Sequence, residues 1–241
     1  SVSAFLLNRS SDLYGYYESE GFDRNDMKMP AGHLRMIEAV VSANPHTVVV
    51  LLCGSAVECP WADRVKAVLY MGLPGQAGGE AIADLLYGRA NPGGRLAESW
   101  PYTYEDVPSS AIYGKTADAL YQEGLYVGYR YYDKAGVPVR WPFGYGMSYT
   151  DFAYSDLTVD GDTVSVTVKN TGSLAGAEIV QLYIEAPQNG LHRPLRELKG
   201  FQKLFLQPGE GRTVTFALTD RSFAVWQDGW VVPGGVYTVA L

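Results

Sequence analysis

The hydrophobic pattern of this chain changes its period near residue 152, and this change most constrains the fold. Before it, short apolar runs alternate with stretches of helical spacing, as at Leu34, Ile37 and Val41. After it, apolar and polar residues alternate strictly, as in TVSVTVKN at 163–170. A chain that changes in this way is expected to form an α/β domain followed by an all-β domain.

Residues 1–108 predict an open α/β sandwich domain that is incomplete at its start. The apolar runs SVSAFLL, TVVVLLC and AVLYMG predict strands, and the second predicts a strand buried on both faces, as in a parallel sheet. Helical spacing is found in AGHLRMIEAVVSA and GGEAIADLLYG. In open sheets of this kind, ligands lie beyond the carboxyl ends of the strands.

Residues 109–151 predict a linker rich in aromatic residues and glycine, and residues 152–241 predict an antiparallel fibronectin III-like β-sandwich. Strands in the second half recur at intervals of roughly 8–12 residues, separated by Gly, Pro and Asn turns. The Cys–Trp–Cys pattern of antibody domains is absent from this half. The fibronectin III type therefore fits better than the antibody type.

Charge and hydropathy exclude several classes of function. The net charge of −7 offers no basic footprint for nucleic acid, and no apolar run reaches the roughly 18 residues of a membrane helix. Residues 1–10 show no charged segment followed by an apolar core, so we expect no signal peptide. The chain lacks a starting Met, which suggests a processed or trimmed piece. We expect a soluble protein, and the choice between cytoplasm and secretion stays open.

Cofactor and metal chemistry find no support in the motifs. Cys53 and Cys59 are expected to be free thiols, with too few neighbouring ligands for zinc. The glycines Gly75, Gly78 and Gly79 resemble a phosphate loop but lack its lysine, so they predict a tight strand-to-helix turn. The three histidines are far apart, and there is no G-x-S-x-G motif. No cofactor and no metal are expected.

The stretch YYESEGFDRNDM, residues 16–27, concentrates carboxylates directly after the first predicted strand. Glycoside hydrolysis needs a carboxylic acid that keeps its proton near neutral pH and gives it to the leaving oxygen. A glutamate at a sheet edge that another domain covers is desolvated, which raises its pKa. A solvated acidic loop is the alternative, and the spacing alone does not choose between the two.

Seven stretches, taken together and in order, resemble the C-terminal half of family 3 glycoside hydrolases, the β-glucosidase group. The resemblance covers nearly the whole chain. The stretches are ESEGFDRNDMKMP, NPHTVVVLLCGSAVECPW, YMGLPGQAGGEAIADLLYGRANPGGRLAESWP, EGLYVGYRYYD, WPFGYGMSYTDFAYSDL, VTVKNTGSLAGAEIVQLYI and RPLRELKGFQKLFLQPGE.

The resemblance implies a retaining β-glucosidase that releases terminal non-reducing β-D-glucose from a β-glucoside or oligosaccharide. It implies a barrel domain, an α/β sandwich and a fibronectin III-like domain, with an Asp nucleophile on the barrel. The family's acid/base motif maps onto Glu20, with Glu18 as the fallback. Asp23 and Arg24 are expected to support that loop.

The chain departs from the family because the barrel and its nucleophile are missing from it. A barrel domain or companion chain is therefore an expected partner, and the chain by itself is expected to hydrolyse no aryl β-glucoside. A homodimer stays open, while nucleic acid and membrane are not expected as partners. The alternatives are a non-catalytic carbohydrate-binding or structural module, and a family 3 enzyme of other specificity, such as a β-xylosidase or N-acetylglucosaminidase.

Overall fold

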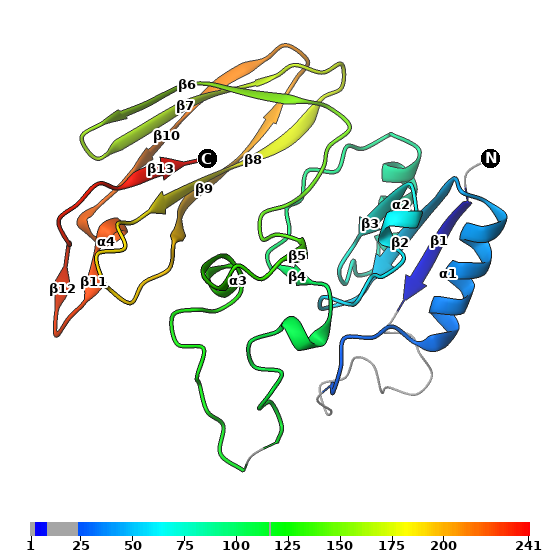
Figure 1. Ribbon diagram of the computed structural model, residues 1–241. Helices are drawn as coiled ribbons and strands as arrows, with labels where there is room; N and C mark the ends of the chain where they lie inside the picture. The colour runs from blue at the N-terminus through cyan, green and yellow to red at the C-terminus, as the bar shows by residue number, and fades with distance from the viewer. Residues whose placement is uncertain (1–2, 9–23, 116) are drawn as a thin grey trace. The chain divides into compact units, whose positions relative to one another are not determined.

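The computed structural model describes residues 3–8, 24–115 and 117–241 (Figure 1). The chain divides into two compact units, and each takes several segments of the sequence. The first unit contains residues 1–86, 99–122 and 138–141, and the second contains residues 87–98, 123–137 and 142–241. The mixed α/β fold followed by a β-sandwich confirms the predicted fold class.

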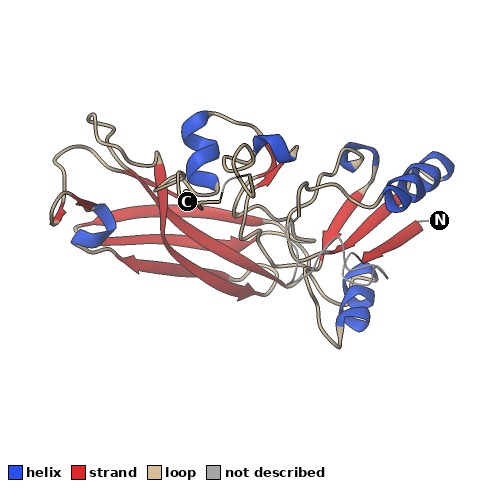
Figure 2. Cartoon of the chain, turned by 90° about the horizontal axis from the view of Figure 1, so that it is seen from below, coloured by secondary structure: helices blue, strands red, loops and turns tan. Residues whose placement is uncertain are grey.

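A parallel three-stranded sheet forms the centre of the first unit, in the order β1-β2-β3. Its strands are β1 (Ser3–Asn8), β2 (Thr47–Leu52) and β3 (Ala67–Tyr70), and α1 (Ala31–Ala43) and α2 (Gly78–Leu86) complete it. Figure 2 shows helices on both sides of these strands. Parallel neighbours require such crossover connections.

The central strand β2 is buried on both faces, as its continuous apolar run predicts. Val50 and Leu52 point to one face and pack against Ile82 of α2. Val49 and Leu51 point to the opposite face and are equally buried. This burial on both faces fixes the carboxyl end of β2. The residues that follow Leu52 therefore begin at a rigid position.

Aromatic side chains attach a second, smaller sheet to the first unit. β4 (Trp100–Pro101) pairs with β5 (Val139–Trp141). Trp100 is 1% exposed and lies edge-to-face against Tyr70, at 5.2 Å, and against Trp141, at 5.3 Å between ring centroids. These ring contacts order the chain just before the short 3-10 helix η2 (Tyr104–Asp106). A second 3-10 helix, η1 (Ala62–Arg64), precedes β3.

The second unit is a sandwich of two antiparallel sheets, as the period of two predicts. One sheet has the order β10-β7-β6, the other has the order β13-β8-β9, and a short hairpin joins β11 to β12. The elements are β6 (Phe152–Asp160), β7 (Thr163–Asn170), β8 (Gly176–Glu185), β9 (Arg196–Leu206), β10 (Gly211–Ala217), α4 (Asp220–Phe223), β11 (Val225–Trp226), β12 (Trp230–Val231) and β13 (Thr238–Ala240).

The sandwich core comes from alternate residues of facing strands. Val166 and Val168 of β7 meet Val180 of β8, and Leu204 and Leu206 of β9 complete the layer. Each of these side chains is at most 2% exposed. Their neighbours along the strands point outward, and this alternation is the source of the sequence signal.

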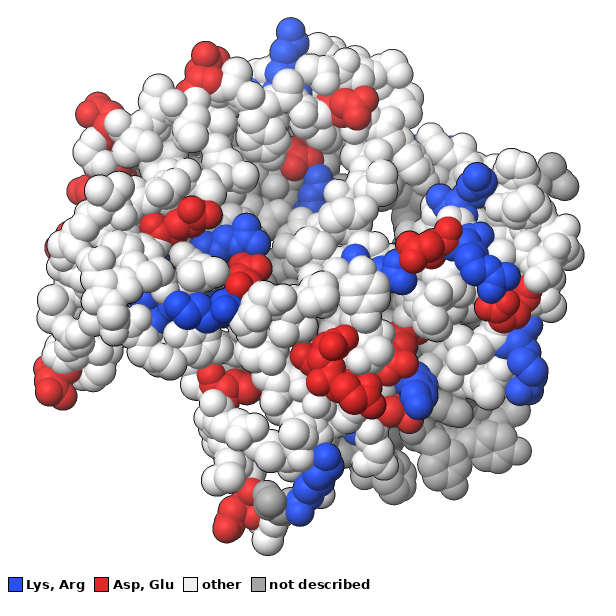
Figure 3. All heavy atoms as spheres, in the orientation of Figure 1, with Lys and Arg blue, Asp and Glu red and all other residues white. Residues whose placement is uncertain are grey.

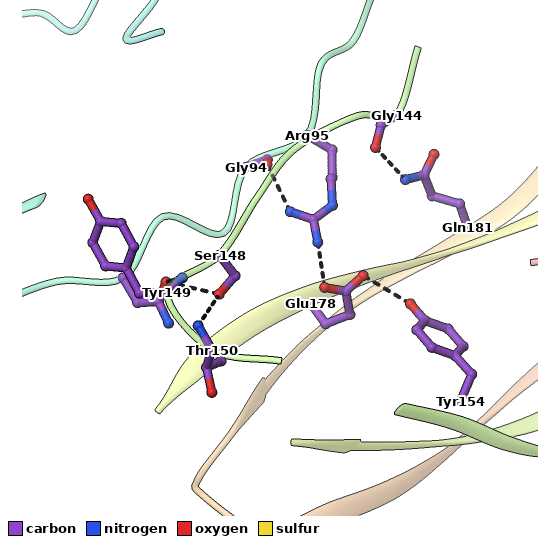
Figure 4. Close-up of polar contacts among 10 residues, drawn as sticks. Gly94, Arg95, Gly144, Ser148, Tyr149, Thr150, Tyr154, Glu178 and Gln181 are labelled. Carbon is purple, nitrogen blue, oxygen red and sulfur yellow. Dashed lines mark hydrogen bonds and ion pairs between the residues drawn. The ribbon is translucent and has the colours of Figure 1, made fainter. Parts of the chain in front are cut away.

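Connecting segments rich in glycine and tyrosine pack on this sandwich (Figure 4). Glu178 of β8 accepts hydrogen bonds from Arg95 and from the Tyr154 hydroxyl, the latter at 2.9 Å. Gln181, three residues further along β8, donates to the carbonyl oxygen of Gly144 at 3.1 Å. Burial and the nearby Glu178 carboxylate raise the pKa of Tyr154, which keeps this hydroxyl a donor.

The short helix α3 (Tyr129–Ala135) is tied to the start of β9. Asp133 accepts two hydrogen bonds from Arg196, at 2.7 and 3.2 Å, and the Tyr129 hydroxyl accepts the Leu198 N–H at 2.9 Å. The bond to Asp133 raises the pKa of Arg196. The predicted linker 109–151 therefore contains a short helix.

Charges on the described surface are mixed. On the face shown in Figure 3, most basic side chains lie beside acidic ones. Exposed pairs such as Arg64 with Glu38 are part of this pattern. Within the described ranges, no helix has the length and apolarity to cross a membrane.

Candidate active site

The candidate site lies at the carboxyl edge of the parallel sheet. β1 runs parallel to β2 with Asn8 opposite Leu52, and β3 runs parallel with Tyr70 opposite Leu51. All three strands therefore end at the same edge. The acidic stretch follows β1 in the sequence, so the chain enters it from this edge.

The chain also returns from the acidic stretch at this edge. Arg24 donates from Nη1 to the hydroxyl oxygen of Ser55 at 3.3 Å, three residues after β2 ends. Three residues further on, the Glu58 backbone N–H donates to the carbonyl oxygen of Met27 at 2.9 Å. The described residues on either side of 9–23, Asn8 and Arg24, thus both lie at the carboxyl end of β2.

The predicted acid/base residue Glu20, its fallback Glu18 and the supporting Asp23 lie outside the described residues. Arg24 is the predicted site residue that the structure places. Its side chain is 18% exposed, and its Nη2 lies 4.0 Å from the Asp26 carboxylate. Its contact with Ser55 fits a supporting role, which stays a prediction.

Glu58 links three segments of the first unit, and the sequence did not single it out. Its backbone N–H contacts Met27, and its carboxylate oxygen Oε1 accepts the backbone N–H of Tyr104 at 3.1 Å. Ser55 and Glu58 both lie in the stretch NPHTVVVLLCGSAVECPW, which carries part of the resemblance, but its pattern did not single them out as site residues. The usable signal was their place, as polar residues directly after a strand buried on both faces.

The segment that carries Tyr104 is itself held by polar and cation–π contacts. Thr103 and Asp106 form a capping box at the start of η2. Arg140 of β5 donates to Asp63 at 2.6 Å, and its guanidinium lies 4.8 Å from the ring centre of Tyr102. Glu58 therefore bonds to a backbone amide whose position is fixed from two sides.

The thiols near the site are unbridged, as the sequence predicts. Cys53 is 1% exposed and Cys59 is 4% exposed, and neither forms a disulfide bond. Cys59 donates a weak hydrogen bond to the carbonyl oxygen of Val57 at 3.4 Å. Among the residues that the structure describes, no group of three or more His, Cys, Asp or Glu side chains is arranged to hold a metal ion.

Comparison with known proteins assigns both halves of the chain. The model of the glycosyl hydrolase family 3 C-terminal domain matches residues 3–129, and that of a fibronectin type III-like domain matches residues 178–241. The first match contains the parallel sheet and the carboxyl edge described above. The second covers most of the β-sandwich.

Similar proteins carry glycosidase names. Thermostable beta-glucosidase B of Acetivibrio thermocellus is 48% identical in an alignment of 237 positions, which covers 93% of this chain and 31% of the relative. An exo-alpha-(1->6)-L-arabinopyranosidase of Bifidobacterium breve is 43% identical over 92% of this chain and 31% of the relative. The crystal structure of the Bifidobacterium adolescentis GH3 beta-glucosidase superposes with a TM-score of 0.92 at 40% identity, over 99% of this chain and 36% of that one.

This chain spans about a third of the length of these proteins. The agreement in sequence and in structure nevertheless runs through both of its units. The predicted resemblance is therefore confirmed, and the chain belongs to glycosyl hydrolase family 3, an enzyme family of O-glycosyl hydrolases, with its C-terminal domain and a fibronectin type III-like domain.

Proposed function

We propose that this chain is part of a retaining β-glucosidase that releases terminal non-reducing β-D-glucose, and that it supplies the acid/base carboxylic acid. The observation that carries the proposal is the position of Asn8 and Arg24. These two residues flank the acidic stretch, and both lie at the carboxyl end of β2. In an open α/β sheet this is the edge where ligands bind.

The mechanism follows from the chemistry of two carboxyl groups. An Asp on a barrel domain attacks the anomeric carbon while Glu20, as the acid, protonates the departing glycosidic oxygen. Glu20 then removes a proton from water, which attacks the glycosyl-enzyme and releases glucose with retained configuration. Retention requires the two carboxyl groups to lie roughly 5–5.5 Å apart. The barrel is thus a necessary partner, and Asp23 and Arg24 support the loop.

Leaving-group dependence tests the role of Glu20. In the complete enzyme with its barrel, Glu20→Gln should lower kcat/KM by about 10²–10⁴-fold on glucosides with poor leaving groups, because proton donation is lost. Activated dinitrophenyl glucosides need no proton and should lose far less. Azide should partly restore turnover by Glu20→Ala on activated substrates and give a glucosyl azide.

The matched control is Glu18→Gln, which should behave like the unchanged enzyme. If Glu18→Gln shows the leaving-group dependence and Glu20→Gln does not, the acid/base role belongs to Glu18. If neither variant shows it, this chain does not supply the acid. Tight sugar binding without turnover by the complete protein would favour the carbohydrate-binding module.

A family 3 enzyme of other specificity is the second candidate. It is favoured by the relative that is named an arabinopyranosidase and is 43% identical, close to the 48% of the named β-glucosidase. Two glycone names at similar identity are compatible with a glycone site that lies outside this part of the protein. Glycone choice then depends on barrel residues, and a panel of aryl glycosides assayed on the complete enzyme distinguishes the sugars.

A further inference from the structure

We propose that Ser55 and Glu58 are positioning residues for the acid/base glutamate. They lie in the segment that follows β2 and hold the end of the acidic stretch against the carboxyl edge of the sheet. This inference rests on the proposed role of Glu20. It adds two residues to which the sequence analysis gave no role, and it predicts a kinetic signature for them.

We call the contacts that Ser55 and Glu58 make with the end of the acidic stretch the clamp. Its first contact joins two side chains. The Arg24 guanidinium donates to the Ser55 hydroxyl at 3.3 Å, and both residues are partly buried. Glu20 precedes Arg24 by only four residues in the sequence. We therefore expect a displacement of Arg24 to be passed along the chain to Glu20.

The second contact joins two backbones through Glu58. Its N–H holds the Met27 carbonyl at 2.9 Å, while its carboxylate holds the Tyr104 N–H at 3.1 Å. The first bond can form with any residue except proline at this position. The second depends on the side chain, and in this proposal it steadies the backbone of Glu58 against Met27.

A clamp of this kind matters because proton donation depends steeply on geometry. A displacement of about 1 Å can lower the rate by about 10²-fold, even when the altered residue is far from the reacting atoms. Side chains that carry a catalytic loop must be locked by their own hydrogen bonds. Ser55 and Glu58 supply such bonds from rigid positions, because the strand just before them is buried on both faces.

The test uses the complete enzyme with its barrel. Ser55→Ala and Glu58→Ala should each lower kcat/KM by about 10–100-fold on poor leaving groups and by less than about threefold on dinitrophenyl glucosides. KM should change little. Glu58→Gln should keep activity within about threefold of the unchanged enzyme, because its amide oxygen still accepts the Tyr104 N–H.

Matched controls separate positioning from general damage. Glu105→Ala removes an exposed carboxylate next to Tyr104 and should leave both substrate classes unaffected. Ser55→Thr keeps the hydroxyl and should keep most of the activity. Thermal unfolding of each variant identifies any variant that fails to fold. If one of Ser55→Ala and Glu58→Ala fails to fold, the leaving-group dependence of the other tests the proposal.

The outcomes separate the two proposals. An equal loss on poor and activated leaving groups would mean that Ser55 and Glu58 are merely structural, and would overturn the inference. Equal behaviour of Glu58→Gln and Glu58→Ala would also overturn it. Glu20→Gln is measured beside them. If that variant lacks leaving-group dependence, the proposed function fails first, whatever the clamp variants do.

Discussion

Glu178 is a carboxylate on which two other segments of the second unit converge. Arg95 reaches it from the connecting segment 87–98, and Tyr154 reaches it from β6 (Figure 4). The side chains of Arg95 and Glu178 are 12% and 10% exposed. In a charge pair so far from water, removal of one member leaves the other as an uncompensated buried charge.

Removal of one member should therefore destabilise the protein strongly. Glu178→Ala is expected to lower the free energy of unfolding by about 3–5 kcal/mol, because Arg95 loses its buried counter-charge. The matched control is Glu38→Ala, whose pair with Arg64 is about half exposed and should contribute about 0.2–1 kcal/mol. Urea unfolding followed by fluorescence measures both. A Glu178→Ala effect as small as that of the control would contradict this account.

At the same scale, the sequence predicted part of the candidate site. One stretch that resembles a family motif supplied all of the predicted site residues, which are Glu20, Glu18, Asp23 and Arg24. Ser55 was missed because its partner Arg24 lies 31 residues away. A contact of this kind depends on strands pairing in parallel, which no local pattern records.

At the scale of elements, the connection between β5 and β6 depends on a glycine. Gly144 has a φ of +80°, and the carboxamide of Gln181 occupies the space where a Cβ would be. The same carboxamide donates to the carbonyl oxygen of Gly144 and accepts from the Tyr183 hydroxyl. The connection thus lies directly on β8.

Gly144→Ala should lower the free energy of unfolding by about 1–3 kcal/mol, from backbone strain and from displacement of Gln181. The matched control is Gly94→Ala, where a Cβ meets nothing within 4 Å and φ is ordinary. Thermal unfolding of both variants compares them. If Gly94→Ala proves the more damaging, Gly144 is not the constrained position.

The whole molecule is organised by repeated crossings between its two units. The chain enters the second unit at residue 87, returns to the first at 99, and repeats this before residue 142. Segments 87–98 and 123–137 therefore fold on strands that come later in the sequence. Two anchors show this, since Arg95 bonds to Glu178 and Asp133 bonds to Arg196.

A chain cut after residue 151, which removes the β-sandwich, should therefore fold poorly. Both early segments would lose their partners, and apolar residues on them would meet water. We expect aggregation in size-exclusion chromatography and a lower Tm than that of the intact chain. A monomeric fragment with an unchanged first-unit transition would show that the first unit is independent of residues 152–241.

The sequence by itself determined the fold class of each half and the order of the two halves. A strand buried on both faces and a strand with one buried face have different hydrophobic periods, so TVVVLLC at 47–53 and TVSVTVKN at 163–170 could be told apart without coordinates. The tertiary structure alone decided which distant residues meet. Three such pairs are far apart in the sequence: Arg24 and Ser55 by 31 residues, Glu58 and Tyr104 by 46, and Arg95 and Glu178 by 83. Periodicity reports the environment of each residue, whereas these pairs depend on the order and register of strands, which are set when the whole core packs.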